Sequence, residues 1–527
     1  MDTEADKQIV ETEAERVEGE TAGSGAGLVN PANIGLLLGC ILLGVLVNYL
    51  VMWKPLGVSY PILVLVFYAV FWSYLRGRLL TGTGFSWLIG AAVALLSLTY
   101  PLFSNELFLV LNFLLLPGLI VAHTTLLARG GQYQWHQVGF LSDILYGVFC
   151  RTLLFIGQPF RLVRDSLKFR QAREGVANRV LIGVLVALPL VFVIVGLLAS
   201  ADLVFESWVS RVPGSLVDLN AYELLYRTLI AVFIAVVAFS YCWSFSRERA
   251  PAPGVSPTSA NPLTWDPVTV ATVLVIIDLI YAAFCVLQFT YLFGGELPPG
   301  FTYSEYARRG FFELVLVTLI NLGILLSCLS FTRAGSAPLS KVVRALYTFL
   351  VACTLVMLVS AFYRMALYED AYGFTQMRIL TQGFMVYLAV VLAVTGFRVW
   401  REETRLLKLY IVISLVAYLA VNFMNVDTIV ARNSIERYRG TGRIDTGYLN
   451  RLSYEAVPTL VTLLDAPDQK VAAEISGGLY LKRQQLRREA SWPSFNLARY
   501  RALRALEGRE LHPFNPYLDE QPRFDNR

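Results

Sequence analysis

The sequence predicts an all-α integral membrane protein, a polytopic bundle of about eleven transmembrane helices with interfacial amphipathic helices and a small C-terminal helical region. Hydrophobic residues make up 56% of the 527 residues and charged residues 16%, with a mean hydropathy of +0.56, whereas a soluble domain usually carries about 25% charge. Apolar stretches long enough to cross ~30 Å of hydrocarbon recur along the chain. These stretches lack strand-like alternation, and backbone groups in lipid need partners within their own segment, so we expect helices.

The predicted spans are interrupted by segments of different composition. We expect eleven spans at about 33–52, 56–75, 84–103, 105–128, 177–200, 222–245, 267–293, 305–331, 338–365, 374–398 and 405–425. The spans group into four over 33–128 and seven over 177–425, and the Pro/Ser/Ala-rich stretch 246–266 is expected to be a flexible linker. A polar, mostly helical tail is expected over 426–527.

Residues 1–32 form an acidic N-terminal tail with eight carboxylates against Lys7 and Arg16. Such a composition predicts disorder. The tail also lacks the basic start and early apolar core of a signal peptide.

Residues 129–176 predict a basic amphipathic region at the membrane interface. The stretch 138–157 is long enough to span, but Asp143 and Arg151 interrupt it and its apolar residues recur on one face. If it did span, the number of spans would become twelve and the C-terminal tail would change sides. The basic residues expected to contact anionic phospholipid of the cytoplasmic leaflet are Arg161, Arg164, Lys168, Arg170 and Arg173.

Lysine and arginine residues predict the orientation. With the N-terminus in the cytoplasm, 21 of the 44 fall in cytoplasmic segments, seven in outer segments and 16 in the C-terminal tail. Cytoplasmic loops of membrane proteins carry the excess of positive charge. We therefore expect a cytoplasmic N-terminus and, with eleven spans, a C-terminal tail outside.

The sequence argues against several classes of protein. The six cysteines are widely separated and only three histidines occur, so neither a disulfide framework nor a metal site is expected, and no cofactor motif is found. Nucleic-acid binding is not expected, because the basic residues gather at membrane edges. The GxxxG motif at Gly35–Gly39 is compatible with a homo-oligomer, but nothing else supports one.

Polar residues gather at the predicted outer ends of the last six spans. Glu305, Arg309 and Glu313 recur every four positions and so share one helix face. A charge that faces lipid at the bilayer centre costs at least ~2.5 kcal/mol, so this stripe should face protein or water. Asp278 lies near the middle of its span, where an ionisable residue is by default a candidate functional group.

These positions predict an outward-facing polar chamber. Its candidate lining residues are Asp278, Tyr281, Glu305, Arg308, Arg309, Glu313, Asn321, Arg364, Asn422, Asn425 and Asp427. Charges near helix ends also often extend to the interface without a function. The chamber predicts that Glu313→Ala harms the protein more than Glu369→Ala.

The stretches "FTYSEYARRGFFELV", "IDTGYLNRLSYEAVPTLVTLL" and "SWPSFNLARYRALRAL" resemble an uncharacterised family of bacterial multi-pass membrane proteins. This family is domain of unknown function 4173, related to group 4153, and the resemblance runs from about residue 30 to about residue 510. The resemblance implies a bacterial inner-membrane protein with a short C-terminal helical region. It implies no activity and no catalytic residues.

Three functions remain open on the sequence alone. The polar stripe and Asp278 are compatible with a transporter or flippase-like protein. The basic interfacial region and the acidic tail are compatible with a non-catalytic membrane sensor or scaffold. Outward carboxylates such as Asp202, Glu206 and Asp427 are compatible with a membrane enzyme that acts on a lipid-linked substrate.

Overall fold

The computed structural model describes residues 29–77, 84–128, 131, 133–137, 139–171, 191, 194, 198, 221–246, 264–289, 311–333, 336–401, 405–488 and 491–513. Regular structure within these ranges is helical, without a strand, and one isolated bridge joins Trp265 to Thr332. The all-α prediction is therefore confirmed. The chain forms two compact units, Met1–Leu102 with Val110–Pro251 and Glu489–Asn496, and Phe103–Leu109 with Ala252–Arg488 and Leu497–Arg527.

Among the described residues, ten helices are long and apolar enough to cross a membrane. They include the predicted spans at 33–52, 84–103, 105–128, 222–245, 267–293, 305–331, 338–365, 374–398 and 405–425. The predicted span at 56–75 is a shorter apolar helix, Ser59–Leu75, which is near the lower limit of about 17 residues for a spanning helix. The predicted span at 177–200 lies outside the described residues, apart from three isolated positions.

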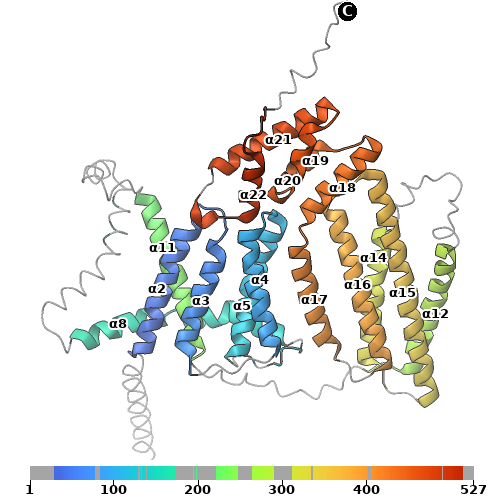
Figure 1. Cartoon of the computed structure of the whole chain (residues 1–527). Coiled ribbons are helices and arrows are strands. Elements are labelled where there is room, and N and C mark those ends of the chain that lie inside the picture. Colours follow the sequence, from blue (N-terminus) through green and yellow to red (C-terminus); the bar gives the residue numbers. More distant parts are fainter. Residues whose placement is uncertain are drawn as a thin grey trace, which may run out of the picture. The chain divides into compact units, whose positions relative to one another are not determined.

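The first unit is built on five labelled apolar helices (Figure 1). They are α2 (Pro31–Val51), α3 (Ser59–Leu75), α4 (Gly84–Leu102), the part of α5 (Glu106–Leu127) from residue 110 onward, and α11 (Ala221–Ser244). α2 and α11 approach each other closely at Gly44, where an added Cβ would stand 2.2 Å from the Ala231 carbonyl oxygen. Glycine is therefore required at this crossing, because it alone leaves room for the neighbouring backbone.

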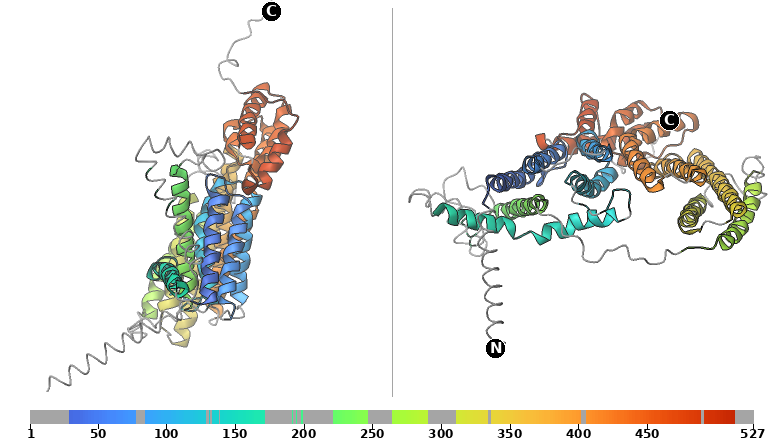
Figure 2. Two further views of the ribbon diagram at one scale, coloured as in Figure 1. Left: turned by 90° about the vertical axis from the view of Figure 1, so that its left-hand side faces the viewer. Right: turned by 90° about the horizontal axis from the view of Figure 1, so that it is seen from below.

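The predicted interfacial region begins as a broken helix. It consists of α6 (Phe140–Leu145), the π-turn η1 (Tyr146–Cys150), α7 (Arg151–Leu154) and α8 (Gln158–Gln171). Figures 1 and 2 show α8 running across the direction of α2 and α3. Phe140–Ser166 also meets the length and composition of a span. Its location at the membrane interface stays a prediction.

The membrane helices of the second unit are α12 (Pro267–Gln288), α14 (Phe311–Phe331), α15 (Ala337–Tyr372), α16 (Gln376–Trp400) and α17 (Leu406–Phe423). α12, α14 and α15 pack on one another through a core of buried apolar side chains that includes Leu274, Leu325 and Leu350. α15 has 36 residues, and at 1.5 Å per residue it is about 54 Å long. It is therefore longer than the hydrocarbon layer, and part of it extends beyond that layer.

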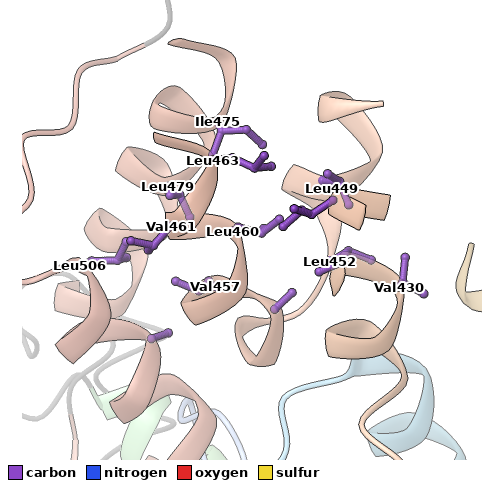
Figure 3. Close-up of a cluster of buried hydrophobic side chains, with 14 of the residues drawn as sticks. Val430, Leu449, Leu452, Val457, Leu460, Val461, Leu463, Ile475, Leu479 and Leu506 are labelled. Carbon is purple, nitrogen blue, oxygen red and sulfur yellow. The ribbon is translucent and has the colours of Figure 1, made fainter. Parts of the chain in front are cut away.

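A compact group of short helices follows α17 in the second unit, and we call residues 426–488 and 497–513 the C-terminal module. It contains α18 (Val426–Thr441), α19 (Thr446–Arg451), η3 (Tyr454–Ala456), α20 (Val457–Leu460), η4 (Val461–Asp465), α21 (Gln469–Arg488) and α22 (Leu497–Leu506). Figure 3 shows its core, to which Leu449, Leu460 and Leu479 all contribute. The Asp445 carboxylate caps α19 by accepting a hydrogen bond from the Tyr448 N–H, at 2.8 Å.

Candidate functional site

Asp278 is a carboxylate buried in the middle of a membrane helix. It lies eleven residues after the start of α12 and ten before its end, which places it about 15 Å from either end. Its side chain is 4% exposed. Neither of its carboxylate oxygens has a hydrogen-bond partner among the described residues.

A line of polar side chains continues from Asp278 toward the C-terminal end of α12. Tyr281, Cys285 and Gln288 follow at intervals of three, four and three residues, a spacing that keeps all four residues on one helix face. The Tyr281 hydroxyl donates a hydrogen bond to Asn321 Oδ1 of α14 at 2.7 Å. We call these residues and their partners the polar track.

Partners on α14 and α15 complete the polar track. Asn321 Nδ2 donates to Thr354 Oγ1 at 3.0 Å. Further along, the Ser360 hydroxyl and Arg364 Nη2 both donate to Gln288 Oε1, at 2.6 and 3.3 Å. The track therefore runs from mid-helix to the level of Arg364, which is itself only 7% exposed.

The other half of α12 makes apolar contacts. Between the helix start and Asp278, the buried residues are Val270 and Leu274, which pack with Leu325, Val343 and Leu350. Water and ions are disfavoured in such a contact. The polar face of α12 is thus one-sided: it extends from Asp278 toward Gln288 and not toward Pro267.

The structure brings together four of the predicted chamber residues: Asp278, Tyr281, Asn321 and Arg364. Glu313 lies in the first turn of α14 and is exposed. Three more, Glu305, Arg308 and Arg309, lie outside the described residues.

The other predicted chamber residues lie on or after α17. Asn422 is buried there, and its amide donates to the Tyr418 carbonyl at 2.9 Å. Asn425 and Asp427 follow at the start of the C-terminal module. Asn425 adopts the left-handed conformation with a φ of 54°, which asparagine tolerates better than most residues.

A second polar cluster lies where the C-terminal module meets the segment 103–105. Asp427 Oδ2 accepts hydrogen bonds from Asn105 Nδ2 at 2.9 Å and from the Ser453 N–H at 3.2 Å. Glu455 accepts from both the N–H and the hydroxyl of Ser104, the latter at 2.7 Å. The Ser104 hydroxyl also accepts from the Tyr454 N–H at 3.0 Å. We call this set of contacts the loop clasp.

A lysine lies beside the loop clasp. Lys482 of α21 donates to the Leu452 carbonyl at 2.6 Å, and its amine lies 5.2 Å from the centre of the Tyr454 ring. Burial lowers the pKa of Lys482 below 10.5, and the negative charges of Asp427 and Glu455 offset only part of that effect. Burial also raises the pKa of Tyr448, whose hydroxyl accepts a hydrogen bond from the Gln376 N–H at 2.8 Å.

Comparison with known proteins gives the family. Residues 90–463 match the family described as "Domain of unknown function (DUF4153)", which is more than half of the chain. The chain belongs to the DUF4153 family. The match confirms the predicted relation to group 4153, whereas the closer resemblance to group 4173 stays a prediction. No curated protein and no solved structure matches the chain.

In this DUF4153 protein the residues predicted to contact anionic lipid lie on or near α8. Arg161 and Arg164 are exposed, and Arg164 donates to Asp165 at 3.0 Å. Lys168 and Arg170 belong to the same helix, and Arg173 lies outside the described residues. The side of α8 that packs on the bundle carries Pro159 and Leu162.

Sequence reasoning missed several residues of the DUF4153 site. Ser360 and Thr354 bind the polar track from α15, and their spacing of six residues places them on different faces of an ideal helix. Ser104 and Glu455 belong to the loop clasp and lie 351 positions apart in sequence. Lys482, which lies beside the loop clasp, was also missed. Gln288 is the exception, since it is recognisable from the sequence as a polar residue further along the span of Asp278 and Tyr281, although the predicted chamber did not include it.

Proposed function

We propose that this DUF4153 protein is a membrane transporter in which Asp278 binds and releases a proton during transport. The observation that carries the proposal is the buried Asp278 carboxylate at mid-helix, with both oxygens lacking a hydrogen-bond partner in the described part of the chain. An ionised carboxylate taken out of water without a partner is costly. Asp278 is therefore expected to hold a proton or a cation.

The polar track supports access to Asp278 from one side of the membrane. Tyr281 and Gln288 extend the polar face toward one end of α12, whereas Val270 and Leu274 form an apolar contact toward the other. A carrier that moves a proton must expose its binding group to each side in turn. The one-sided track fits one of these two states.

Charge and the loop clasp both support one orientation in the membrane. If α2, α3 and α4 each cross once, the segment after α4 lies on the side opposite to the start of α2. Ser104 and Asn105 of that segment bind Glu455 and Asp427 of the C-terminal module. These contacts favour a module on the side opposite to the N-terminus, independently of whether 140–166 spans. With the positive-inside rule, they support a cytoplasmic N-terminus and an outer module in a bacterial inner membrane.

The basic side of α8 supports contact with anionic phospholipid. Arg161 and Arg164 are exposed next to the exposed apolar side chains of Phe160 and Val163. A helix with basic and apolar residues side by side suits the boundary between lipid headgroups and acyl chains.

A sensor or scaffold is the second candidate, and one observation favours it. Tyr281, Asn321 and Thr354 satisfy one another in a chain of hydrogen bonds, as expected where polar groups only hold helices together. An enzyme receives less support, because Asp202 and Glu206 lie outside the described residues and Asp427 is engaged in the loop clasp.

Proton flux into proteoliposomes tests the proposal. Purified protein is reconstituted with a pH-sensitive dye inside, and a potassium diffusion potential drives protons inward. We expect faster acidification than in empty liposomes, and a return to the empty rate with Asp278→Asn. Glu313→Gln is the matched control, because Glu313 is an exposed carboxylate of the same bundle. Equal flux in the wild type and in folded Asp278→Asn would overturn the proposal, and it would favour the scaffold if both proteins acidify no faster than empty liposomes.

Infrared spectroscopy gives a second readout that needs no transport. A carboxyl group that takes up a proton in the pH range of the flux shows a C=O stretch that grows as the pH falls. We expect Asp278→Asn to lose one such band and Glu313→Gln to keep it. A spectrum without a band that depends on Asp278 would show that this carboxyl group does not titrate.

A further inference from the structure

The N-terminal acidic tail leaves the described part of the protein beside α8. Val29, the first described residue, packs against the same buried cluster as Leu162 of α8, which is fully buried. α2 begins two residues later, at Pro31, and is capped by the Asn30 side chain. The point at which residues 1–28 join the described chain therefore packs on the same cluster as α8.

The two segments carry opposite charge. Residues 1–28 contain eight carboxylates and two basic residues, Lys7 and Arg16. The 14-residue helix α8 contains four basic residues and one acid, Asp165. On the described part of α8, Arg161 and Arg164 are exposed. The charge pattern thus pairs a strongly acidic segment with a basic surface.

We propose that residues 1–28 bind the basic side of α8 and compete there with anionic phospholipid. The tail would act as an internal substitute for lipid headgroups, so α8 engages the membrane surface when anionic lipid displaces the tail. Reversible release of a basic segment from anionic lipid is a known kind of electrostatic switch. The proposal concerns regulation and does not depend on what the protein transports.

Length and tethering favour the intramolecular contact. A chain of 28 residues reaches at most about 95 Å, whereas α8 with its 14 residues is about 21 Å long. Tethering gives the tail an effective concentration in the millimolar range at α8. On α8 the contact involves the exposed Arg161 and Arg164, so it should weaken as salt shortens the screening length from about 10 Å at 0.1 M to about 3 Å at 1 M.

Carbodiimide cross-linking of the full-length protein tests the proposal, because this reagent joins a lysine amine directly to a carboxylate. Lys168 is the only lysine in the sequence of α8. In nanodiscs of neutral lipid we expect cross-linked peptides between Lys168 and the carboxylates of residues 1–28. Replacing a third of the lipid by phosphatidylglycerol, or raising the salt to 1 M, should lower their yield at least about fivefold.

Variants of α8 and a control lysine distinguish a specific contact between the tail and α8 from random cross-linking. Arg161→Gln with Arg164→Gln removes two exposed charges from α8 and should lower the yield by a similar factor. Lys54 follows the other end of α2, a helix long and apolar enough to cross the membrane. It is the internal control, and we expect no link between it and the tail, because the bilayer of the nanodisc separates the two ends of a spanning helix. The absence of Lys168 links in neutral lipid overturns the proposal. A yield unchanged by salt in the wild type overturns it as well, and that test needs no variant to fold.

Discussion

Asp427 and Asn105 lie 322 positions apart in sequence, and the Asn105 amide donates a hydrogen bond to the Asp427 carboxylate at 2.9 Å. The same carboxylate accepts a hydrogen bond from the Ser453 N–H. One acidic side chain at the start of α18 thus holds both the segment before α5 and the turn before η3. Because Asp427 is 4% exposed, water cannot readily replace these bonds when the side chain is removed.

Replacing Asp427 should therefore destabilise the protein. Asp427→Ala leaves the Asn105 amide and the Ser453 N–H without their acceptor, and an unpaired buried donor costs about 1–3 kcal/mol. We expect a lower melting temperature and faster proteolysis in the segment 103–105. Glu436→Ala is the matched control, since Glu436 is exposed on the same helix. Equal melting temperatures for the two variants would contradict a structural role for the loop clasp.

The sequence predicted the class of fold because length and composition alone identify membrane helices. It also placed Asp278, Tyr281, Asn321 and Arg364 in one candidate site, since depth along a helix and spacing on one face can both be counted. It could not predict the loop clasp, because Ser104 and Glu455 are joined only by the packing of distant segments. Nor could it tell which face of α14 is buried, so the exposed position of Glu313 was not foreseen.

The sequence predicted that Glu313→Ala harms the protein more than Glu369→Ala, and the burial of the two side chains predicts the reverse. Glu369 of α15 is 4% exposed, and its carboxylate accepts a hydrogen bond from Gln382 Nε2 at 2.6 Å, whereas Glu313 is exposed. Glu369→Ala should therefore lower the melting temperature more than Glu313→Ala, with a loss of about 1–3 kcal/mol for the buried position. Thermal unfolding of both purified variants in one detergent checks this order. The opposite order would support the predicted role of Glu313 as a lining residue of the polar chamber.

Helix packing in the first unit predicts that alanine has different effects on stability at two glycines of α2. An added Cβ at Gly44 would stand 2.2 Å from the Ala231 carbonyl oxygen, whereas one at Gly35 meets no atom within 4 Å. Gly44→Ala forces α2 and α11 apart and should cost about 1–3 kcal/mol. Gly35→Ala adds the same methyl group to the same helix and should be close to neutral or slightly stabilising. Folded yield and melting temperature check both, and equal effects would contradict the close crossing.

The half-buried amine of Lys482 makes stability depend on pH. Burial lowers its pKa below 10.5 in the folded protein, so between the lowered value and 10.5 the unfolded chain holds a proton that the folded chain does not. Stability rises with pH wherever the unfolded state binds more protons. The cost of the buried charge is therefore fully present below the folded pKa and disappears as the pH approaches 10.5.

The test compares the melting temperatures of the wild type and a variant at each pH from about pH 8 to about pH 10.5. Lys482→Met removes the titrating amine, so the wild type should gain stability relative to this variant as the pH rises. Lys470→Met is the matched control, because Lys470 is exposed in the first turn of α21 and its amine stays hydrated in both states. Its difference from the wild type should stay constant over the same range. A constant difference for Lys482→Met as well would mean that its amine is as well hydrated in the folded protein as in the unfolded chain.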